Sequence, residues 1–203
     1  AKEELSKTFH RLIKPDSTKL KKITIKFNGN ELDPIDPFLL HKSSTQKLPT
    51  KKLPGKNGDV MLKPYIMPHH DKLTNKEQKQ LGGKDGYIKN QGFYVYGNNR
   101  LILYGTWFKL FPYSSLSKLV RIPVDIPNSL DTEWKITVDK SEVQIPSKWK
   151  SQLKELVKQH IISKSERVFR GRSDALDAGD IQPLWIRNAA RGKIKYFVNT
   201  KHL

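Results

Sequence analysis

The sequence of 203 residues contains no cysteine, which excludes disulfides, thiolate nucleophiles and metal sites built on cysteine. It has no apolar run close to the roughly 20 residues that a helix needs to cross a bilayer, and no signal peptide is found. The lysine-containing phosphate loop of P-loop NTPases and the G-x-S-x-G elbow of hydrolases are also missing. We therefore expect a protein of the reducing cytoplasm, with no membrane partner and none of these common catalytic sites.

Negatively charged residues are scarce: 20 Asp and Glu stand against 38 Lys and Arg, which gives a net charge of +18. Residues 1–90 and 91–203 each carry 19 basic and 10 acidic residues, so the positive charge is spread evenly and forms no basic arm. A spread charge attracts polyanions but does not define a groove. Nucleic-acid binding and a surface that lysine merely solubilises therefore both stay open.

The hydrophobic pattern predicts an α+β fold with a mostly β core. Helical spacing of apolar residues predicts a helix over residues 3–14, and Asn28-Gly29 predicts a tight turn. Strands are expected where apolar residues alternate or run together, at Lys22–Phe27, Val60–Met67, Gly92–Tyr96, Arg100–Tyr104, Leu119–Ile126 and Trp134–Val138. Residues 41–57, which are polar and rich in lysine and proline, are expected to form a long exposed loop.

Three further elements are expected. A short helix covers Thr74–Leu81, with Thr74 or Asn75 as its cap. A helix capped by Ser147 carries an apolar stripe made of Trp149, Leu153, Leu156, Val157, His160 and Ile161. Pro183–Arg187 and Lys195–Asn199 are typical of a closing hairpin, so the C-terminal part is expected to be a small helix and hairpin extension.

Two groups of polar residues could carry chemistry. His69 and His70 could bind a metal, but neighbouring histidines rarely share one ion and we identify no third ligand. A surface pair after Pro68 is the favoured interpretation, and no metal site is predicted. Asp33 and Asp36, set between prolines, are expected to fix a turn through backbone N–H groups rather than to act as an acid–base pair.

Lys140 lies on a short polar turn between the strand expected to end at Val138 and the pair Glu142-Val143. A lysine in such a turn is held by the backbone, so it can be directed at a phosphate on another domain as a point charge. Taken alone, the residue types favour an ordinary solvated lysine in a lysine-rich chain.

The segment Gln91–Ile102 resembles the G-F-x-V-Y-x-N-N-R-L-I hairpin of the MORC proteins and their bacterial relatives. These proteins are ATPases of the GHKL superfamily, which also includes histidine kinases, MutL, gyrase B and the heat-shock chaperone of the same class. Residues Ile23–Phe38 resemble the N-G…P-x-D-P-F run of the bacterial members, and Lys140–Val143 is similar to the K-x-E-V turn of the superfamily. The resemblance covers roughly residues 1–160.

This resemblance implies a transducer, the domain that follows the ATP-binding domain in these proteins and has a ribosomal-protein-like β-α-β fold. Residues 1–20 would be the helix that connects it to the ATPase domain. Residues 21–162 would be the transducer, and residues 163–203 a linker and small C-terminal subdomain. In the superfamily the lysine of the K-x-E-V turn reaches the γ-phosphate of ATP, so Lys140 and Ser141 are the expected nucleotide contacts.

The Asn and D-x-G-x-G motifs that bind Mg-ATP in the superfamily are absent from this sequence. ATP and magnesium would therefore be bound by a separate N-terminal ATPase domain, and this fragment alone is expected neither to bind ATP tightly nor to hydrolyse it. The full-length protein is expected to be an ATPase that closes as a homodimer.

The alternative is a nucleic-acid-binding module, for DNA or RNA, that acts independently of ATP. Lysines follow phosphates and exposed aromatic rings stack on unpaired bases. The basic residues expected to contact phosphates are Lys47, Lys51, Lys52, Lys56 and Arg100. The aromatic residues expected to stack on bases are Tyr94, Tyr96, Tyr104, Trp107 and Phe108.

Overall fold

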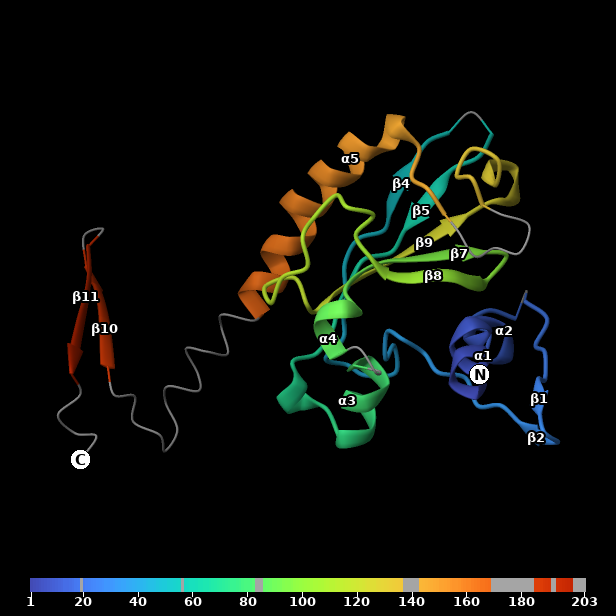
Figure 1. The fold of residues 1–203 in the computed structure, drawn as a ribbon, viewed down its shortest axis with the longest axis horizontal. Helices are drawn as coiled ribbons and strands as arrows, with labels where there is room; N and C mark the ends of the chain where they lie inside the picture. Colours follow the sequence, from blue (N-terminus) through green and yellow to red (C-terminus); the bar gives the residue numbers. More distant parts are fainter. Residues whose placement is uncertain are drawn as a thin grey trace. The chain divides into compact units, whose positions relative to one another are not determined.

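The computed structural model describes residues 1–18, 20–55, 57–82, 86–136, 143–168, 185–190 and 193–198. The chain divides into two compact units, Ala1–Ser165 and Glu166–Leu203, which are described separately. The first unit has a mixed sheet of seven strand segments with a few helices (Figure 1). The expected α+β class with a mostly β core is therefore confirmed.

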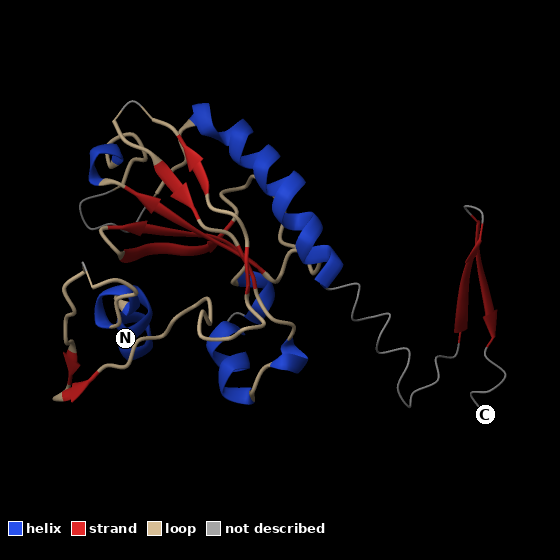
Figure 2. Ribbon diagram, turned by 180° about the vertical axis from the view of Figure 1, so that it is seen from behind, coloured by secondary structure: helices blue, strands red, loops and turns tan. Residues whose placement is uncertain are grey.

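The main sheet is built around β9 (Val120–Ile126), seen from both sides in Figures 1 and 2. β7 (Gly92–Gly97) pairs with β9 in parallel, and β8 (Arg100–Thr106) pairs antiparallel with β7. The hairpin predicted at these residues is confirmed, and its turn places Asn98 and Asn99 at φ 50° and 62°. Asparagine tolerates this left-handed conformation better than most residues, which explains the Asn-Asn pair.

The other edge of β9 pairs with antiparallel strands. β5 (Val60–Leu62) and β6 (Tyr65–Ile66) both pair directly with β9. The single strand predicted over 60–67 is divided into these two at Pro64, which has no N–H to donate. β4 (Lys51–Leu53) pairs with β5, and β3 (Gln46–Lys47) pairs with β6. The prediction of a long exposed loop over 41–57 is therefore wrong at β3 and β4.

The physical reason for this error is that an edge strand can be short and lysine-rich. Lysine on an edge strand discourages pairing with other chains, so a polar composition does not exclude a strand there. By contrast β7 is buried along its whole length, and β9 is buried at six of its seven residues. The apolar run of β7 is typical of a strand covered on both faces, whereas β9 alternates its apolar residues with Arg121, Pro123 and Asp125.

The N-terminal helix predicted over 3–14 is confirmed with a break. α1 (Lys2–Thr8) and α2 (His10–Ile13) are separated at Phe9, whose φ of −106° and ψ of 12° are not helical. Both helices lie against β8. The turn at Asn28-Gly29 is also confirmed, joining β1 (Lys26–Phe27) to β2 (Asn30–Glu31).

The remaining helices are short and capped by local contacts. α3 (Asn75–Gly82) begins with a capping box, in which the Thr74 N–H donates to the Glu77 carboxylate at 2.9 Å and the Glu77 N–H donates to Thr74 Oγ1. α4 (Gly86–Lys89) follows it, and two 3₁₀ turns, η1 (His70–Lys72) and η2 (Asn128–Leu130), lie in the connections.

The predicted helix near residue 147 is α5 (Ser147–Val157), which continues into a π-helical turn, η3 (Lys158–Ile162). Ser147 is the first helical residue and makes no cap hydrogen bond, so its predicted role as cap is wrong. The apolar stripe is largely confirmed, since Trp149, Leu153, Val157 and Ile161 are buried. Figure 1 shows α5 lying along one side of the main sheet.

The strand predicted over Trp134–Val138 does not begin at Trp134. Residues 131–135 form turns instead, and Lys135 has a φ of 46° that a strand does not allow. Thr137 and Val138 lie outside the described residues. In the second unit, β10 (Trp185–Ala190) and β11 (Lys193–Val198) form an antiparallel hairpin, which confirms the predicted closing hairpin with slightly shifted bounds.

Candidate functional site

The predicted phosphate contacts Lys140 and Ser141 lie outside the described residues, as does Lys56. The residues that flank residues 137–142 are well anchored. The N–H of Gln144 donates to the carbonyl of Trp134 at 2.9 Å, so the chain leaves and re-enters the described core at adjacent points. Trp134 is buried, and its ring lies 5.3 Å from the ring of Trp149 on α5.

The remaining basic residues predicted to contact phosphates do not share one environment. Lys52 pairs with Asp59 at 2.8 Å, and the Arg100 guanidinium lies 5.6 Å from the ring centre of Phe9. Lys51 is half-buried in a small apolar depression beside Leu156. Only Lys47 lines a large cleft.

The aromatic residues predicted to stack on bases are mostly inaccessible. Tyr94, Tyr96 and Trp107 are each 1% exposed, so the prediction is wrong for these three. Their rings supply the core of the sheet, because β7 is covered on both faces. Tyr104 and Phe108 are half-buried.

The cleft that contains Lys47 has a volume of about 790 Å³. It is lined by α2, by the segment around Asp36 and by strands β3 and β6. Its cationic side chains are Arg11, Lys14, Lys47 and Lys63, and its carboxylates are Asp16 and Asp36. The lining therefore carries an excess of positive charge.

Hydrogen bonds and ion pairs inside the cleft leave two cations for a ligand. Arg11 forms an ion pair with Asp125, and Lys63 reaches the same carboxylate at 3.0 Å. Within the part of the chain that the structure describes, Lys14 and Lys47 have no carboxylate within ion-pair distance. An anion entering this cleft would therefore meet two lysines without displacing an ion pair.

The carboxylate of Asp36 has a structural role beside this cleft. It accepts the backbone N–H groups of Phe38 at 2.9 Å and Leu40 at 2.8 Å. This confirms the expectation that Asp36 fixes a turn. Asp36 is therefore occupied by backbone donors and does not face Asp33 as a catalytic partner would.

His10 lines the same cleft, with its Nε2 2.8 Å from the hydroxyl of Tyr96. Burial and then the neighbouring charge of Arg11 lower the pKa of His10 to about 3, so the imidazole is neutral at pH 7. Burial also raises the pKa of Tyr96 well above its usual value. Because a general acid or base needs a pKa near the working pH, this pair is unsuited to acid–base catalysis.

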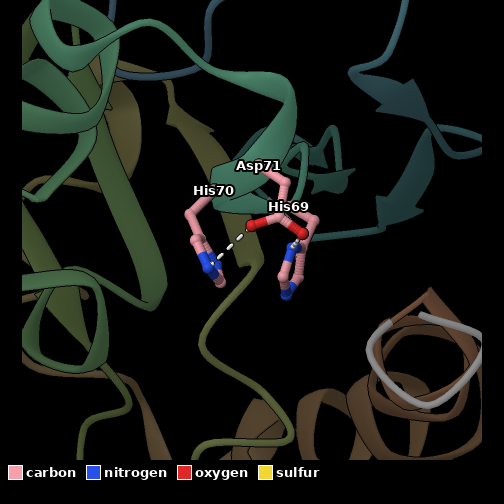
Figure 3. Close-up of side chains that lie close together, drawn as sticks. All are labelled: His69, His70 and Asp71. Carbon is pink, nitrogen blue, oxygen red and sulfur yellow. Dashed lines mark hydrogen bonds and ion pairs between the residues drawn. The ribbon is translucent and has the colours of Figure 1, made fainter. Parts of the chain in front are cut away.

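His69, His70 and Asp71 form a second polar cluster, drawn in Figure 3. His69 Nδ1 lies 3.0 Å from one oxygen of Asp71, and His70 Nε2 lies 2.8 Å from the other. The expectation of a surface pair is wrong for His69, which is only 6% exposed. The sequence reasoning also missed Asp71, although the adjacent letters H-H-D were a sufficient signal.

Lys14 and Lys63 were missed for a different reason. They come to the cleft from α2's C-terminal end and from the break between β5 and β6, and no local pattern links them to Lys47.

Comparison of the chain with protein-family models, curated proteins and solved structures gives no match. Among the described residues, no helix has both the length and the apolar character that crossing a membrane requires.

Proposed function

We propose that this chain is the coupling region of a larger ATPase of the GHKL superfamily. In this proposal Lys140 contacts the γ-phosphate of Mg-ATP held by a separate ATPase domain, with Ser141 beside it. The observation that carries the proposal is the anchored base of the segment between Trp134 and Gln144, closed by one backbone hydrogen bond of 2.9 Å. In this proposal Lys140 acts as a point charge for the phosphate, and the anchored ends at Trp134 and Gln144 support that role.

The connection from this base to the sheet is short and is anchored by the buried residue Leu130. The Trp134 N–H donates to the carbonyl of Leu130 at 2.9 Å, and Leu130 is fully buried in η2, four residues after β9 ends at Ile126. A displacement of residues 137–142 would therefore be passed to the central strand rather than absorbed by a loose linker. This supports a role in relaying nucleotide state.

The hairpin that carries the resemblance also lies at the centre of this unit. Gly92–Gly97 is the buried strand β7, parallel to β9, and the Asn-Asn turn connects it to β8. We also propose that the full-length protein is cytoplasmic and dimerises when ATP closes the ATPase domain over the coupling region. ATP turnover would belong to the full-length protein, not to this chain alone.

Lys140→Ala in the full-length protein is expected to lower ATP turnover by at least about tenfold, because the charge that offsets the phosphates is lost. Steady-state ATP hydrolysis and ATP-dependent cross-linking of dimers measure the two consequences. Lys135→Ala is the matched control, since Lys135 is an exposed lysine of the same region. Unchanged turnover together with unchanged closure in Lys140→Ala would overturn the proposal.

A second candidate function, binding of nucleic-acid phosphates, is favoured by one specific observation. Lys14 and Lys47 point their charges at a cleft of about 790 Å³ in which the other two cations already share Asp125. A phosphate backbone would supply the anions that these two lysines lack. The net charge of +18 would add long-range attraction.

The double variant Lys14→Ala/Lys47→Ala is expected to weaken DNA or RNA binding about tenfold and to lower the slope of log K against log salt by about two. Fluorescence anisotropy of a labelled oligonucleotide over a salt series measures both quantities. Lys52→Ala is the control, because Lys52 already pairs with Asp59. Binding that vanishes at modest salt, or a slope equal to that of the unmodified chain, would remove this candidate.

A further inference from the structure

The cluster of His69, His70 and Asp71 gathers three donor groups within a very small space. One ligand atom from each residue lies within 4.8 Å of the others. Figure 3 shows both imidazole rings turned toward the carboxylate of Asp71. The ring centres of the two histidines are 4.0 Å apart. Imidazole and carboxylate groups gathered this closely are among the usual ligands of a zinc ion.

The backbone around these residues is held in place by its own hydrogen bonds. The N–H of Lys72 donates to the carbonyl of His69, and the N–H of Leu73 donates to the carbonyl of His70, each at 3.0 Å. The side chain of Gln78 on α3 donates to the same His70 carbonyl at 3.0 Å. The turn is therefore fixed from both sides, so a bound ion would not have to order this backbone.

Packing anchors the two ends of the turn as well. Met67 before it and Leu73 after it are buried, at 1% and 7% exposed. His69 is nearly buried, whereas the His70 side chain is 54% exposed. One ligand is therefore rigid and the other can rotate from solvent toward an arriving ion, which gives the ion an entry path.

We propose that His69, His70 and Asp71 form a binding site for a divalent transition-metal ion of the zinc class. Zinc binds imidazole nitrogen at about 2.0–2.1 Å and carboxylate oxygen at about 2.0–2.2 Å, so tetrahedral donor atoms lie about 3.3 Å apart. Each histidine nitrogen lies near a different oxygen of Asp71, at 3.0 Å for His69 and 2.8 Å for His70, and each distance is within about half an ångström of that separation. The donor atoms that lie up to 4.8 Å apart must move closer to one another. Rotation of the exposed His70 side chain supplies that movement.

The chemistry of the ligands selects the ion. Two imidazoles and one carboxylate suit zinc and its neighbours cobalt and nickel better than magnesium or calcium, which prefer oxygen ligands. Three protein ligands leave a fourth position for water or for a group from a partner. This site goes beyond the proposed coupling function and does not depend on it, because none of its residues belongs to the segment around Lys140.

The test is titration of the full chain with Co²⁺, followed by visible absorption, and with Zn²⁺, followed by calorimetry. We expect one equivalent to bind and Co²⁺ to show the intense visible bands of a low-coordinate site. Asp71→Asn and His70→Ala should each weaken binding by at least about tenfold. His41→Ala is the control, since this exposed histidine lies against Glu77 on another face of α3.

Circular dichroism and thermal unfolding of each variant separate loss of metal binding from loss of fold. Absence of binding by the folded, unmodified chain would overturn the proposal. Binding that Asp71→Asn and His70→Ala leave unchanged would overturn it equally, since the ion would then be held elsewhere.

Discussion

Arg121→Ala is expected to lower the free energy of unfolding by about 3–5 kcal/mol. Arg121 is the second residue of β9 and is only 1% exposed, although its guanidinium always carries a positive charge. It donates hydrogen bonds to the carbonyl of Pro37 and the carbonyl of Leu81. One side chain therefore ties the segment before β3 and the end of α3 to the central strand.

Several losses combine in this substitution. The Arg121 guanidinium also lies 5.5 Å from the ring centre of Tyr94, so removing the side chain opens a cavity beside an aromatic core. Two buried carbonyls lose their donor, and each unsatisfied group costs about 1–3 kcal/mol. The methylene stem contributes packing that alanine cannot replace.

Denaturant unfolding followed by tryptophan fluorescence measures the change. Arg121→Met keeps most of the volume but removes the donors and the buried charge, so the difference between the two variants separates packing from these polar contributions. Lys109→Ala is the control, because Lys109 is exposed and its loss is expected to change stability by less than about 0.5 kcal/mol. An Arg121→Met variant as stable as the unmodified chain would contradict any stabilising role for the two hydrogen bonds.

The fold could be predicted from the sequence wherever the burial of one strand, or the residue types of one turn, determine the local pattern of residues. β7 has an apolar run because both of its faces are covered, and β9 alternates apolar residues with Arg121, Pro123 and Asp125. Asn28 and Asn98, with φ of 50° at both, sit in turns that their residue types favour. β3 and β4 could not be predicted, because their pairing with β6 and β5 comes from tertiary contacts and not from their own polar composition.

The candidate site was harder to predict than the fold. Lys47 was chosen for its charge alone, and the structure places it with Lys14 and Lys63, which come from elements 16 or more residues away. Tyr94 and Tyr96 were chosen as exposed stacking rings, yet a residue type carries no record of which face of a strand is covered. Convergence of distant residues and burial are both properties of the assembled sheet.

His10, which lines the cleft, makes the stability of the folded chain sensitive to acid. His10 is neutral in the folded chain because burial and Arg11 lower its pKa to about 3, whereas an unfolded histidine titrates near pH 6.5. Below pH 6.5 the unfolded chain therefore binds a proton that the folded chain excludes. The stability that neutral His10 confers is fully present above pH 6.5 and is lost progressively as the pH falls toward 3.

Between pH 7 and pH 5 we expect His10 to account for a loss of about 2 kcal/mol of unfolding free energy. His10→Gln should remove that part of the loss, because glutamine keeps a hydrogen-bonding group for the Tyr96 hydroxyl but does not titrate. Unfolding curves at a series of pH values, for both proteins, measure the difference in slope. The range stops at pH 5 so that carboxylates contribute little.

His69→Gln separates the contribution of His69 to the pH dependence of unfolding from that of His10, since burial lowers the pKa of both histidines. The pKa of His69 is also lowered, chiefly by burial, so this imidazole contributes to the acid sensitivity with the same sign. His70→Gln is the control, since His70 is exposed.

If His10→Gln left the slope between pH 7 and pH 5 unchanged, His10 would have to be accessible to protons in the folded chain. The conclusions that His10 is neutral and that the positive charge of the cleft comes from Arg11 and the lysines would then be wrong.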